Sequence, residues 1–233
     1  MKRKTQKKLL EIVKKNYQQI SGHFSQTREK QPKPEILSLL KRVSEKDKVL
    51  DVGCGNGRIV PYLPKNVNYL GLDENQDFID IAKKKYSSDS IQFRVCDCLN
   101  LNQEPEINFD KIFCLAVLHH IPSKQLQIDF LKQLKNKINQ EGEVILSVWN
   151  LYKKKKFRKL IFKFRILGFL GKNDMDKGDI LFPWKNSKGE EISKRYYHAF
   201  TKKELKKIAK KANFKIQSLY KKDYNIYIIL TRK

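Results

Sequence analysis

The residues best suited to chemistry lie in a glycine-rich turn and at the ends of two later apolar runs. The turn occupies residues 51–57, directly after a short apolar run, and has the sequence DVGCGNG. Glycines in such a turn let the backbone bend tightly and come close to a bound ligand. Asp73 and Asp97 each follow a further apolar run. If the three runs are parallel strands, these groups meet at one edge of a sheet and form a ligand site.

The composition of the turn distinguishes between two nucleotide-like cofactors. A dinucleotide site has the pattern G-x-G-x-x-G/A, whereas here Arg58 occupies the last position and Gly57 comes one residue early. Asp51 would repel a pyrophosphate and suits a cationic ligand that has no phosphate. S-adenosylmethionine is such a ligand, because it carries a sulfonium, an ammonium and a ribose. Asp73 is placed to accept both ribose hydroxyls, and Asp97 is placed to accept the adenine amino group.

A glycine turn alone is compatible with a simple tight turn, but the turn and the two later acids together favour the cofactor. The predicted cofactor-binding residues are Asp51, Gly53, Cys54, Gly55, Gly57, Asp73, Asp97, Cys98 and Ala116. No metal site is predicted, since Cys96 and Cys98 are too close for a normal zinc pair and have no second ligand cluster. We interpret the four cysteines as reduced thiols of a cytoplasmic protein.

Apolar strands alternate with amphipathic helices along the middle of the chain, which predicts an α/β fold with a mostly parallel sheet and helices on both faces. Strands are expected at 49–52, 67–72, 91–95, 109–115 and 144–149, and helices at 5–20, 75–86, 123–139 and 201–212, with a short one after Pro32 and Pro34. The turn at 51–57 is expected to lead into a helix, and residues 23–28 are expected to form a polar loop. Residues 214–220 and 224–231 predict a two-stranded hairpin at the end.

The 233 residues suit one domain with a sizeable insertion. Residues 1–46 are expected to form an N-terminal helical cap and 47–150 the cofactor-binding core. Residues 151–200 interrupt the alternation and are expected to form a basic and aromatic insertion that acts as a substrate lid. Residues 201–233 then complete the sheet with a helix and the strand hairpin.

The positive charge is concentrated at the two ends of the chain. The formal net charge is +25, and residues 47–150 hold 12 basic and 14 acidic side chains against 25 basic and 7 acidic in residues 151–233. Compositional drift would also have made the middle basic, so we favour a functional cause. Such a field suits a polyanion, either nucleic acid or lipid headgroups. No apolar run reaches the ~18 residues of a membrane span, so no membrane partner is expected, and the start has no apolar signal core.

Motifs along most of the chain carry a family resemblance. From Val49 to Trp149 the sequence resembles a class I S-adenosylmethionine-dependent methyltransferase, which implies a Rossmann-like, seven-stranded sheet with an antiparallel C-terminal hairpin. The segments at 20–28 (ISGHFSQTR), 116–121 (AVLHHI), 179–185 (DILFPWK) and 195–200 (RYYHAF) are similar to the tRNA wobble-uridine carboxymethyl methyltransferases. The last strand begins with Asp223-Tyr224-Asn225, where that family tends to carry an Asp-Asn-Trp-like start.

The resemblance implies methylation of a carboxymethyl group on uridine 34 in the anticodon loop of tRNA. A carboxylate has a pKa near ~4 and is ionised at neutral pH, so no general base is needed. The enzyme must instead align the sulfonium and hold one carboxylate oxygen with cationic or donor groups. The candidates for this catalytic role are Arg28, His119, His120, Arg195 and His198.

The flanking lysines and aromatic residues admit more than one interpretation. Lysines at 153–156 and 202–211 are suited to phosphate contacts. Phe157, Phe162, Phe164 and Trp184 are suited either to stacking on an unpaired base or to packing within the lid, and 157–170 would also suit an amphipathic helix on an acidic membrane.

Two other functions stay open at this point. One is methylation of a small molecule, either a quinone-type acceptor or a carboxylate, and the other is RNA binding by a non-catalytic methyltransferase fold. Some relatives work with a small zinc-containing activator subunit, which the resemblance adds as a candidate partner.

Overall fold

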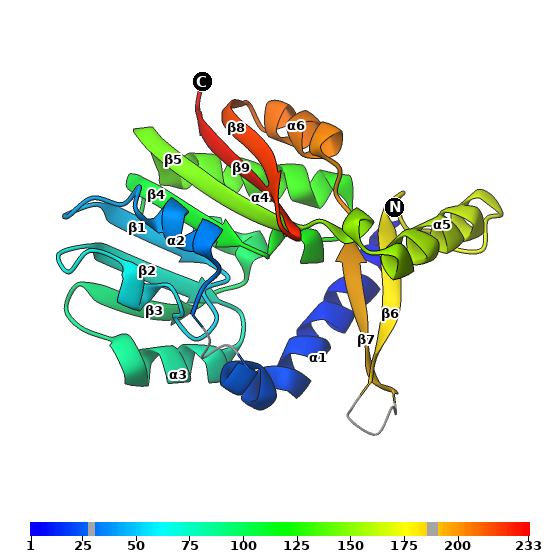
Figure 1. Ribbon diagram of the computed structural model, residues 1–233, viewed down its shortest axis with the longest axis horizontal. Helices are drawn as coiled ribbons and strands as arrows, with labels where there is room; N and C mark the ends of the chain where they lie inside the picture. The colour runs from blue at the N-terminus through cyan, green and yellow to red at the C-terminus, as the bar shows by residue number, and fades with distance from the viewer. Residues whose placement is uncertain (28–30, 186–190) are drawn as a thin grey trace.

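The computed structural model describes residues 1–27, 31–185 and 191–233, and a seven-stranded sheet forms its centre (Figure 1). The strand order is β3-β2-β1-β4-β5-β9-β8. The strands of this sheet are β1 (Lys48–Val52), β2 (Asn68–Asp73), β3 (Ile91–Val95), β4 (Phe109–Leu115), β5 (Ile138–Trp149), β8 (Phe214–Lys222) and β9 (Asn225–Arg232). The first five pair in parallel, while β9 runs antiparallel between β5 and β8. This confirms the predicted fold class and the C-terminal hairpin.

Helices cover both faces of the sheet because the apolar strand residues project alternately to either side. They are α2 (Pro34–Leu40) and α3 (Gln76–Tyr86) on one face, and α4 (Lys124–Lys137) and α6 (Lys202–Lys211) on the other. On the first face Leu40 and Ile79 pack against Val49. On the second, Leu131 and Ile208 belong to the core that includes Leu50, and all these side chains are buried. The strand ends that carry the predicted cofactor residues are therefore held rigidly.

The expected helix directly after the glycine turn is absent from this described segment, so that prediction was wrong. The chain passes through turns into a short 3₁₀ helix, Val60–Tyr62. Two prolines explain the difference. Pro61 lies inside this short element, and Pro64 forces Leu63 into an extended conformation with φ −88° and ψ 157°. The glycine turn is followed by irregular chain, in which Ile59 and Val60 are buried and Tyr62 is exposed, instead of a regular helix.

The N-terminal helix is longer than predicted. Helix α1 spans Arg3–Thr27, so the described part of the predicted loop at 23–28 is helical. Polar residues such as Ser, Gln and Thr cost at most ~0.7 kcal/mol each relative to Ala in a helix, so an established helix continues through them. Strand β5 likewise starts at Ile138, before the predicted 144. Leu9 and Val13 of α1 pack against Tyr196, which joins the N-terminus to the insertion.

The segment between β5 and α6 forms a separate projection beside the sheet (Figure 1). It contains α5 (Lys155–Phe169) and a two-stranded antiparallel sheet of β6 (Asp179–Lys185) and β7 (Glu191–His198). As predicted, this segment is an insertion and does not form a further βαβ unit. Within the described ranges, no helix combines the length and apolar character needed to cross a bilayer.

Candidate functional site

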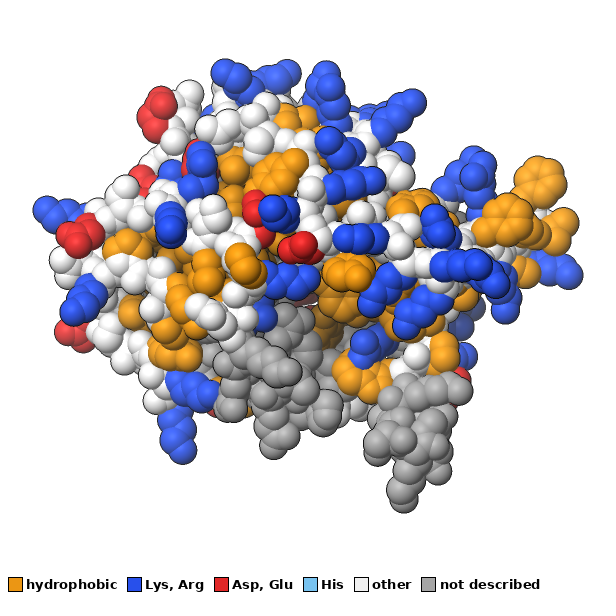
Figure 2. Space-filling model, in the orientation of Figure 1, with side chains coloured by type: hydrophobic (Ala, Val, Ile, Leu, Met, Phe, Trp, Pro, Cys, Tyr) orange, Lys and Arg blue, Asp and Glu red, His pale blue; other side chains and the backbone are white. Residues whose placement is uncertain are grey.

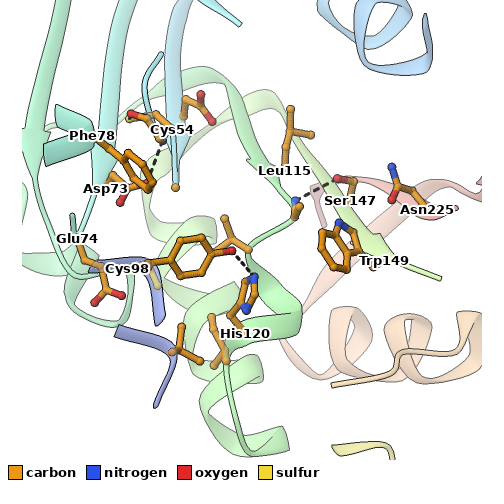
Figure 3. A pocket seen from close by; sticks show the side chains of 18 of the residues that line it. Cys54, Asp73, Glu74, Phe78, Cys98, Leu115, His120, Ser147, Trp149 and Asn225 are labelled. Atoms are coloured by element: carbon orange, nitrogen blue, oxygen red, sulfur yellow. Dashed lines mark hydrogen bonds between the residues drawn. The ribbon is translucent and has the colours of Figure 1, made fainter. Parts of the chain in front are cut away.

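A cavity of about 660 Å³ opens at the carboxyl ends of β1, β2, β4 and β5 (Figure 3). Eight of the nine predicted cofactor residues line it: Asp51, Gly53, Cys54, Gly55, Asp73, Asp97, Cys98 and Ala116. The acidic side chains of Asp73 and Glu74 lie on one side of the view, and Trp149 and Asn225 lie on the opposite side. The cavity therefore spans from the glycine turn to the insertion.

The glycine turn needs glycine for different reasons at different positions. Gly53 has a φ of +74°, and a Cβ there would collide with the Val117 side chain. Gly55 has a φ of +56° and open space around it. Gly57 does not line the cavity. It packs against the ring of Tyr86, which a Cβ at this position would meet at 2.9 Å. Gly57 therefore serves packing, whereas Gly53 and Gly55 bring backbone to the cavity wall.

Asp73 ties the glycine turn to the end of β2. Its carboxylate accepts hydrogen bonds from the backbone N–H of Gly55 (2.9 Å) and of Asn75 (3.0 Å), one at each oxygen. Burial raises the pKa of Asp73, and these N–H donors oppose that rise. Because each carboxylate oxygen has a further lone pair, Asp73 can also accept two hydroxyls of a ribose that enters the cavity.

Asp51 is an acid with little solvent and few partners. It is 3% exposed, and its carboxylate accepts a hydrogen bond from the Tyr69 hydroxyl at 3.0 Å. Burial raises the pKa of Asp51 to about 7, with a further contribution from the negative charge of Asp73. A cation in the cavity would favour the ionised carboxylate again. The residue therefore fits a positively charged ligand such as the ammonium of S-adenosylmethionine.

Asp97 and Glu74 add negative charge to the same end of the cavity. Asp97 begins the 3₁₀ helix Cys98–Gln103 and accepts from the Leu99 N–H at 2.8 Å and from the Asn100 amide at 3.2 Å. It lines the cavity and keeps lone pairs for an adenine amino group. Burial raises the pKa of Glu74, and the charges of Asp97 and Asp73 raise it further. Glu74 was not predicted, because it directly follows the strand-end acid Asp73 and no spacing pattern distinguishes it.

Among the predicted catalytic residues that the structure describes, His120 lines the cavity. Its Nε2 lies 2.7 Å from the hydroxyl of Tyr17, which comes from α1. Burial lowers the pKa of His120 to about 3, and the nearby charge of Arg195 lowers it further. His120 is therefore a neutral ring at pH 7 and offers hydrogen bonds instead of positive charge.

His119 and His198 lie behind the cavity wall. The His119 ring is fully buried and packs against Trp149 and Tyr197, with centroid distances of 5.2 Å to each. Burial lowers its pKa well below the ordinary value. His198 bonds Asp179 at 2.6 Å, and Tyr196 donates to the same carboxylate oxygen at 2.8 Å. Neither histidine lines the cavity.

The His198 contacts form a buried ionic cluster at the base of the insertion. Burial alone would lower the pKa of His198, but the carboxylates of Asp179 and Glu204 outweigh it and raise the value to about 9. Glu204 belongs to α6, and its Oε1 lies 3.2 Å from Nε2. The cluster therefore fastens β6 and β7 to the body of the protein.

Neither of the two predicted arginines is among the described cationic side chains that line the cavity. The Arg195 guanidinium lies over the Trp184 ring and does not line the cavity. Arg28 lies outside the described residues. The cationic side chains on the wall, which sequence reasoning had not assigned to the reaction, are Lys14, Lys33, Arg58, Lys154 and Lys156.

Three lysines gather around Tyr224 at the edge of the cavity. The Nζ atoms of Lys33, Lys153 and Lys154 lie 5.9, 4.5 and 5.0 Å from the centre of the Tyr224 ring. They come from segments before α2 and after β5, and Tyr224 is in the turn before β9. The unusual start of the last strand, with Tyr224 and Asn225, was the sequence signal for this wall, because both residues line the cavity.

The sequence and the fold are similar to those of known methyltransferases. A family model described as a methyltransferase domain matches residues 49–142. A solved S-adenosylmethionine-dependent methyltransferase of Methanosarcina mazei superposes with a TM-score of 0.68 at 21% identity, covering 87% of this chain and 99% of the other. A DhpI–SAH complex gives a TM-score of 0.68 at 15% identity over 96% of this chain and 97% of the other.

Curated relatives share a narrower description, tRNA (carboxymethyluridine(34)-5-O)-methyltransferase. The Xenopus tropicalis relative is 26% identical over 95% of this chain and 41% of its own length. The Saccharomyces cerevisiae relative is 33% identical over 60% of this chain and 49% of its own. The Schizosaccharomyces pombe relative is 27% identical over 87% of this chain and 88% of its own. The chain thus spans less than half of the vertebrate and budding-yeast relatives.

Residues 49–142 thus match a methyltransferase domain, and the whole sheet has the fold of solved S-adenosylmethionine-dependent methyltransferases. The glycine turn and the acidic end of the cavity fit S-adenosylmethionine as the cofactor. Within that class the sequence resembles the tRNA carboxymethyluridine(34) methyltransferases.

Proposed function

We propose that the protein transfers a methyl group from S-adenosylmethionine to the carboxymethyl group of wobble uridine 34 in tRNA, giving the methyl ester. The observation that carries the proposal is the two-ended cavity. Acids surround its cofactor end, while lysines and aromatic rings surround its other end. Such an arrangement accepts a cationic donor and an anionic, planar acceptor side by side. The names of the relatives supply the particular acceptor.

The reaction asks the protein for alignment more than for proton transfer. The cofactor supplies an electrophilic methyl group, and a carboxylate is already ionised at neutral pH. A neutral His120 fits this requirement, because no group has to remove a proton. Lys33 or Lys154 would hold one carboxylate oxygen, which leaves the other free to approach the methyl group in line. The aromatic wall would keep water away from the reacting atoms.

The basic surface supports tRNA as the acceptor. Figure 2 shows lysine and arginine side chains crowding the part of the molecule around α5. Helix α5 and the residues before it carry Lys153, Lys154, Lys155, Lys156, Arg158, Lys159, Lys163 and Arg165, and α6 carries Lys202, Lys203, Lys206, Lys207, Lys210 and Lys211. Contacts of this kind bind phosphates with strong salt dependence and little choice of sequence.

Several finer assignments belong to the same proposal. The segment 1–46 would act as a cap, 47–150 as the cofactor-binding core, 151–200 as a lid over the acceptor, and 201–233 as completion of the sheet. Arg195, which lies on the Trp184 ring outside the cavity wall, would bind a phosphate or carboxylate of the tRNA, and Arg28 is proposed for the same role. Replacing either arginine by alanine should spare cofactor binding and lower turnover.

The setting and the partners follow from the same reasoning. Cys54, Cys96, Cys98 and Cys114 are free thiols, as expected in the reducing cytoplasm where tRNA is modified. A small zinc-containing activator subunit is a candidate partner, because the resemblance to the carboxymethyluridine methyltransferases implies one for some members of that family. Adding such a subunit to the purified protein tests that requirement directly.

The experiment combines purified protein, tritiated S-adenosylmethionine and bulk tRNA from a strain that lacks the final esterification step. The proposal predicts label in tRNA that mild alkali releases, because an ester hydrolyses. Alkali-stable label would contradict it and indicate base or ribose methylation. No label with or without the activator subunit would also contradict it and leave the small-molecule acceptor or a non-catalytic RNA-binding role.

A further inference from the structure

The end of β5 places an aromatic ring and a carboxamide next to each other on the cavity wall. Trp149 is the last residue of β5 and Asn150 follows it, and both line the cavity. Trp149 lies on the side away from Asp73 and Glu74 (Figure 3). This wall is therefore separate from the acidic end assigned to the cofactor.

The Trp149 ring is held in place by a stack of aromatic side chains. Tyr197 lies 4.9 Å from it, centre to centre, with the two planes 23° apart. Phe182 stacks on Tyr197 at 5.3 Å with planes 17° apart. Since Tyr197 and Phe182 belong to β7 and β6, the insertion fixes the orientation of the indole. A fixed aromatic ring at a cavity wall is a stacking surface for a planar ligand.

The side chain of Asn150 has a hydrogen-bond acceptor that no described residue uses. It is 9% exposed, and its backbone N–H is satisfied by the carbonyl oxygen of Tyr224 at 2.7 Å. Its side-chain Oδ1 is buried and has no hydrogen-bond partner among the described residues. Most buried polar atoms have a hydrogen-bond partner, so an unpartnered acceptor in a residue that lines a cavity indicates a place where a bound molecule can donate. The neighbouring Asn225 differs, because its amide donates to the Tyr227 hydroxyl at 3.0 Å.

We propose that Trp149 and Asn150 form a uracil-binding subsite, in which the base stacks on the indole and the Asn150 carboxamide contacts its Watson–Crick edge. That edge presents the N3–H donor between two carbonyl acceptors. A carboxamide offers one acceptor and one donor in a plane, so it can accept from N3–H and donate to a neighbouring carbonyl oxygen. Unpaired bases in RNA loops are bound in this manner. The proposal rests on the proposed function and adds the residues that select the base.

The test uses synthetic anticodon stem-loops that carry 5-carboxymethyluridine at position 34, with or without a methyl group on N3. Methyl transfer is measured as kcat/KM for wild-type protein, for Asn150→Ala and for Asn68→Ala. Asn68 is an exposed asparagine at the start of β2, outside the cavity lining, and serves as the matched control. Cofactor affinity and thermal midpoint are recorded for each protein.

Wild-type protein and Asn68→Ala are expected to use the stem-loop without the N3-methyl group about tenfold to a hundredfold better than the N3-methylated one. This is the range for a lost buried hydrogen bond. Asn150→Ala should use the stem-loop without the N3-methyl group about tenfold less well than wild type does, and it should bind the cofactor as wild type does. Its preference for that stem-loop over the N3-methylated one should be less than threefold. Trp149→Phe should keep more activity than Trp149→Leu, because it keeps a stacking ring.

The outcomes distinguish this inference from the proposed function. Equal use of both stem-loops by wild-type protein would overturn the subsite while leaving the methyl transfer intact. Undiminished preference in a folded Asn150→Ala protein would do the same. Failure of wild-type protein to methylate either stem-loop, with cofactor still bound, would overturn the proposed function on which the subsite rests.

Discussion

Asp51 should couple cofactor binding to pH, and the coupling can be worked from its surroundings. Its carboxyl is buried beside Asp73, so its pKa is about 7 in the free protein against an ordinary value of 3.8. A bound cation stabilises the ionised form and lowers that pKa again. S-adenosylmethionine should therefore bind mainly to protein with Asp51 ionised, and below pH 7 binding should release a proton.

The magnitude follows from the linkage between ionisation and binding. If only the ionised form binds, affinity at pH 6 is about tenfold lower than at pH 8. At pH 7 about half a proton is released for each cofactor bound. Asp51→Asn removes the titrating group and keeps an acceptor for the Tyr69 hydroxyl, whose contact with Asp51 is 3.0 Å. Its affinity should be lower than wild type at pH 8 and should change less than twofold between pH 6 and pH 8.

Isothermal titration calorimetry measures both quantities. Titrations in buffers with different ionisation enthalpies give the number of protons released, and the same curves give the affinity. The stability of the free protein supplies an independent check. A raised pKa means that Asp51 favours the folded state below the unfolded value of about 4, and that this contribution is lost as pH rises through about 7. Asp51→Asn should then be the more stable apoprotein at pH 8. A wild-type affinity that changes less than twofold between pH 6 and pH 8 would refute the reasoning, as would an unchanged tenfold dependence in Asp51→Asn.

Further predictions concern the turn, the ionic cluster and the basic surface. Gly53→Ala should cost about 2 kcal/mol or more of unfolding free energy in urea, because it combines a φ of +74° with a collision, whereas Gly55→Ala, with open space, should cost about 1 kcal/mol; equal costs would contradict this. Because the pKa of His198 is raised to about 9, its contribution of about 3 kcal/mol is present below pH 6.5 and lost as pH rises through 9. His198→Gln should remove that part of the pH dependence, and parallel stability curves would count against it. Reversing the lysine charges across 202–211 should weaken binding of all tRNAs and flatten the salt dependence, and a selective loss for one tRNA would contradict a phosphate-binding role.

The parts of the fold that could be predicted from sequence are those fixed by periodicity and by glycine and proline. Apolar strand runs such as 109–115 and the amphipathic helix over 75–86 were located closely, because burial on both faces of a sheet leaves few alternatives. The extension of α1 to Thr27 was missed, because residues 23–27 are mostly polar and this composition is compatible with either a loop or the end of a helix. Pro61 and Pro64 are the sequence signals against a helix after the glycine turn, because proline interrupts helical hydrogen bonding.

The site likewise has one part that could be predicted from the sequence and one part that could not. Asp51, Asp73 and Asp97 of the cofactor end were predictable, because each lies at or just after the end of a strand and these strand ends share one edge of the sheet. The acceptor end is built from α1, the segment before α2, the end of β5 and the turn before β9, so Tyr17, Lys33, Trp149 and Tyr224 meet only in the folded chain. Sequence reasoning instead favoured the histidines by type, and His119 and His198 proved to be buried behind the wall.

The central claim, transfer of a methyl group to the wobble carboxylate, is tested most directly by mass spectrometry of nucleosides from defined anticodon stem-loops. Stem-loops carrying either 5-carboxymethyluridine or plain uridine at position 34 are incubated with S-adenosylmethionine and wild-type protein, with and without the zinc-containing subunit. Asp73→Ala, which loses the carboxylate that holds the Gly55 and Asn75 N–H groups, serves as the cofactor-binding control. The account predicts one added methyl group, as an ester, solely on the carboxymethylated stem-loop with wild-type protein. A methyl group on plain uridine, or none on either stem-loop while the cofactor binds, would contradict it.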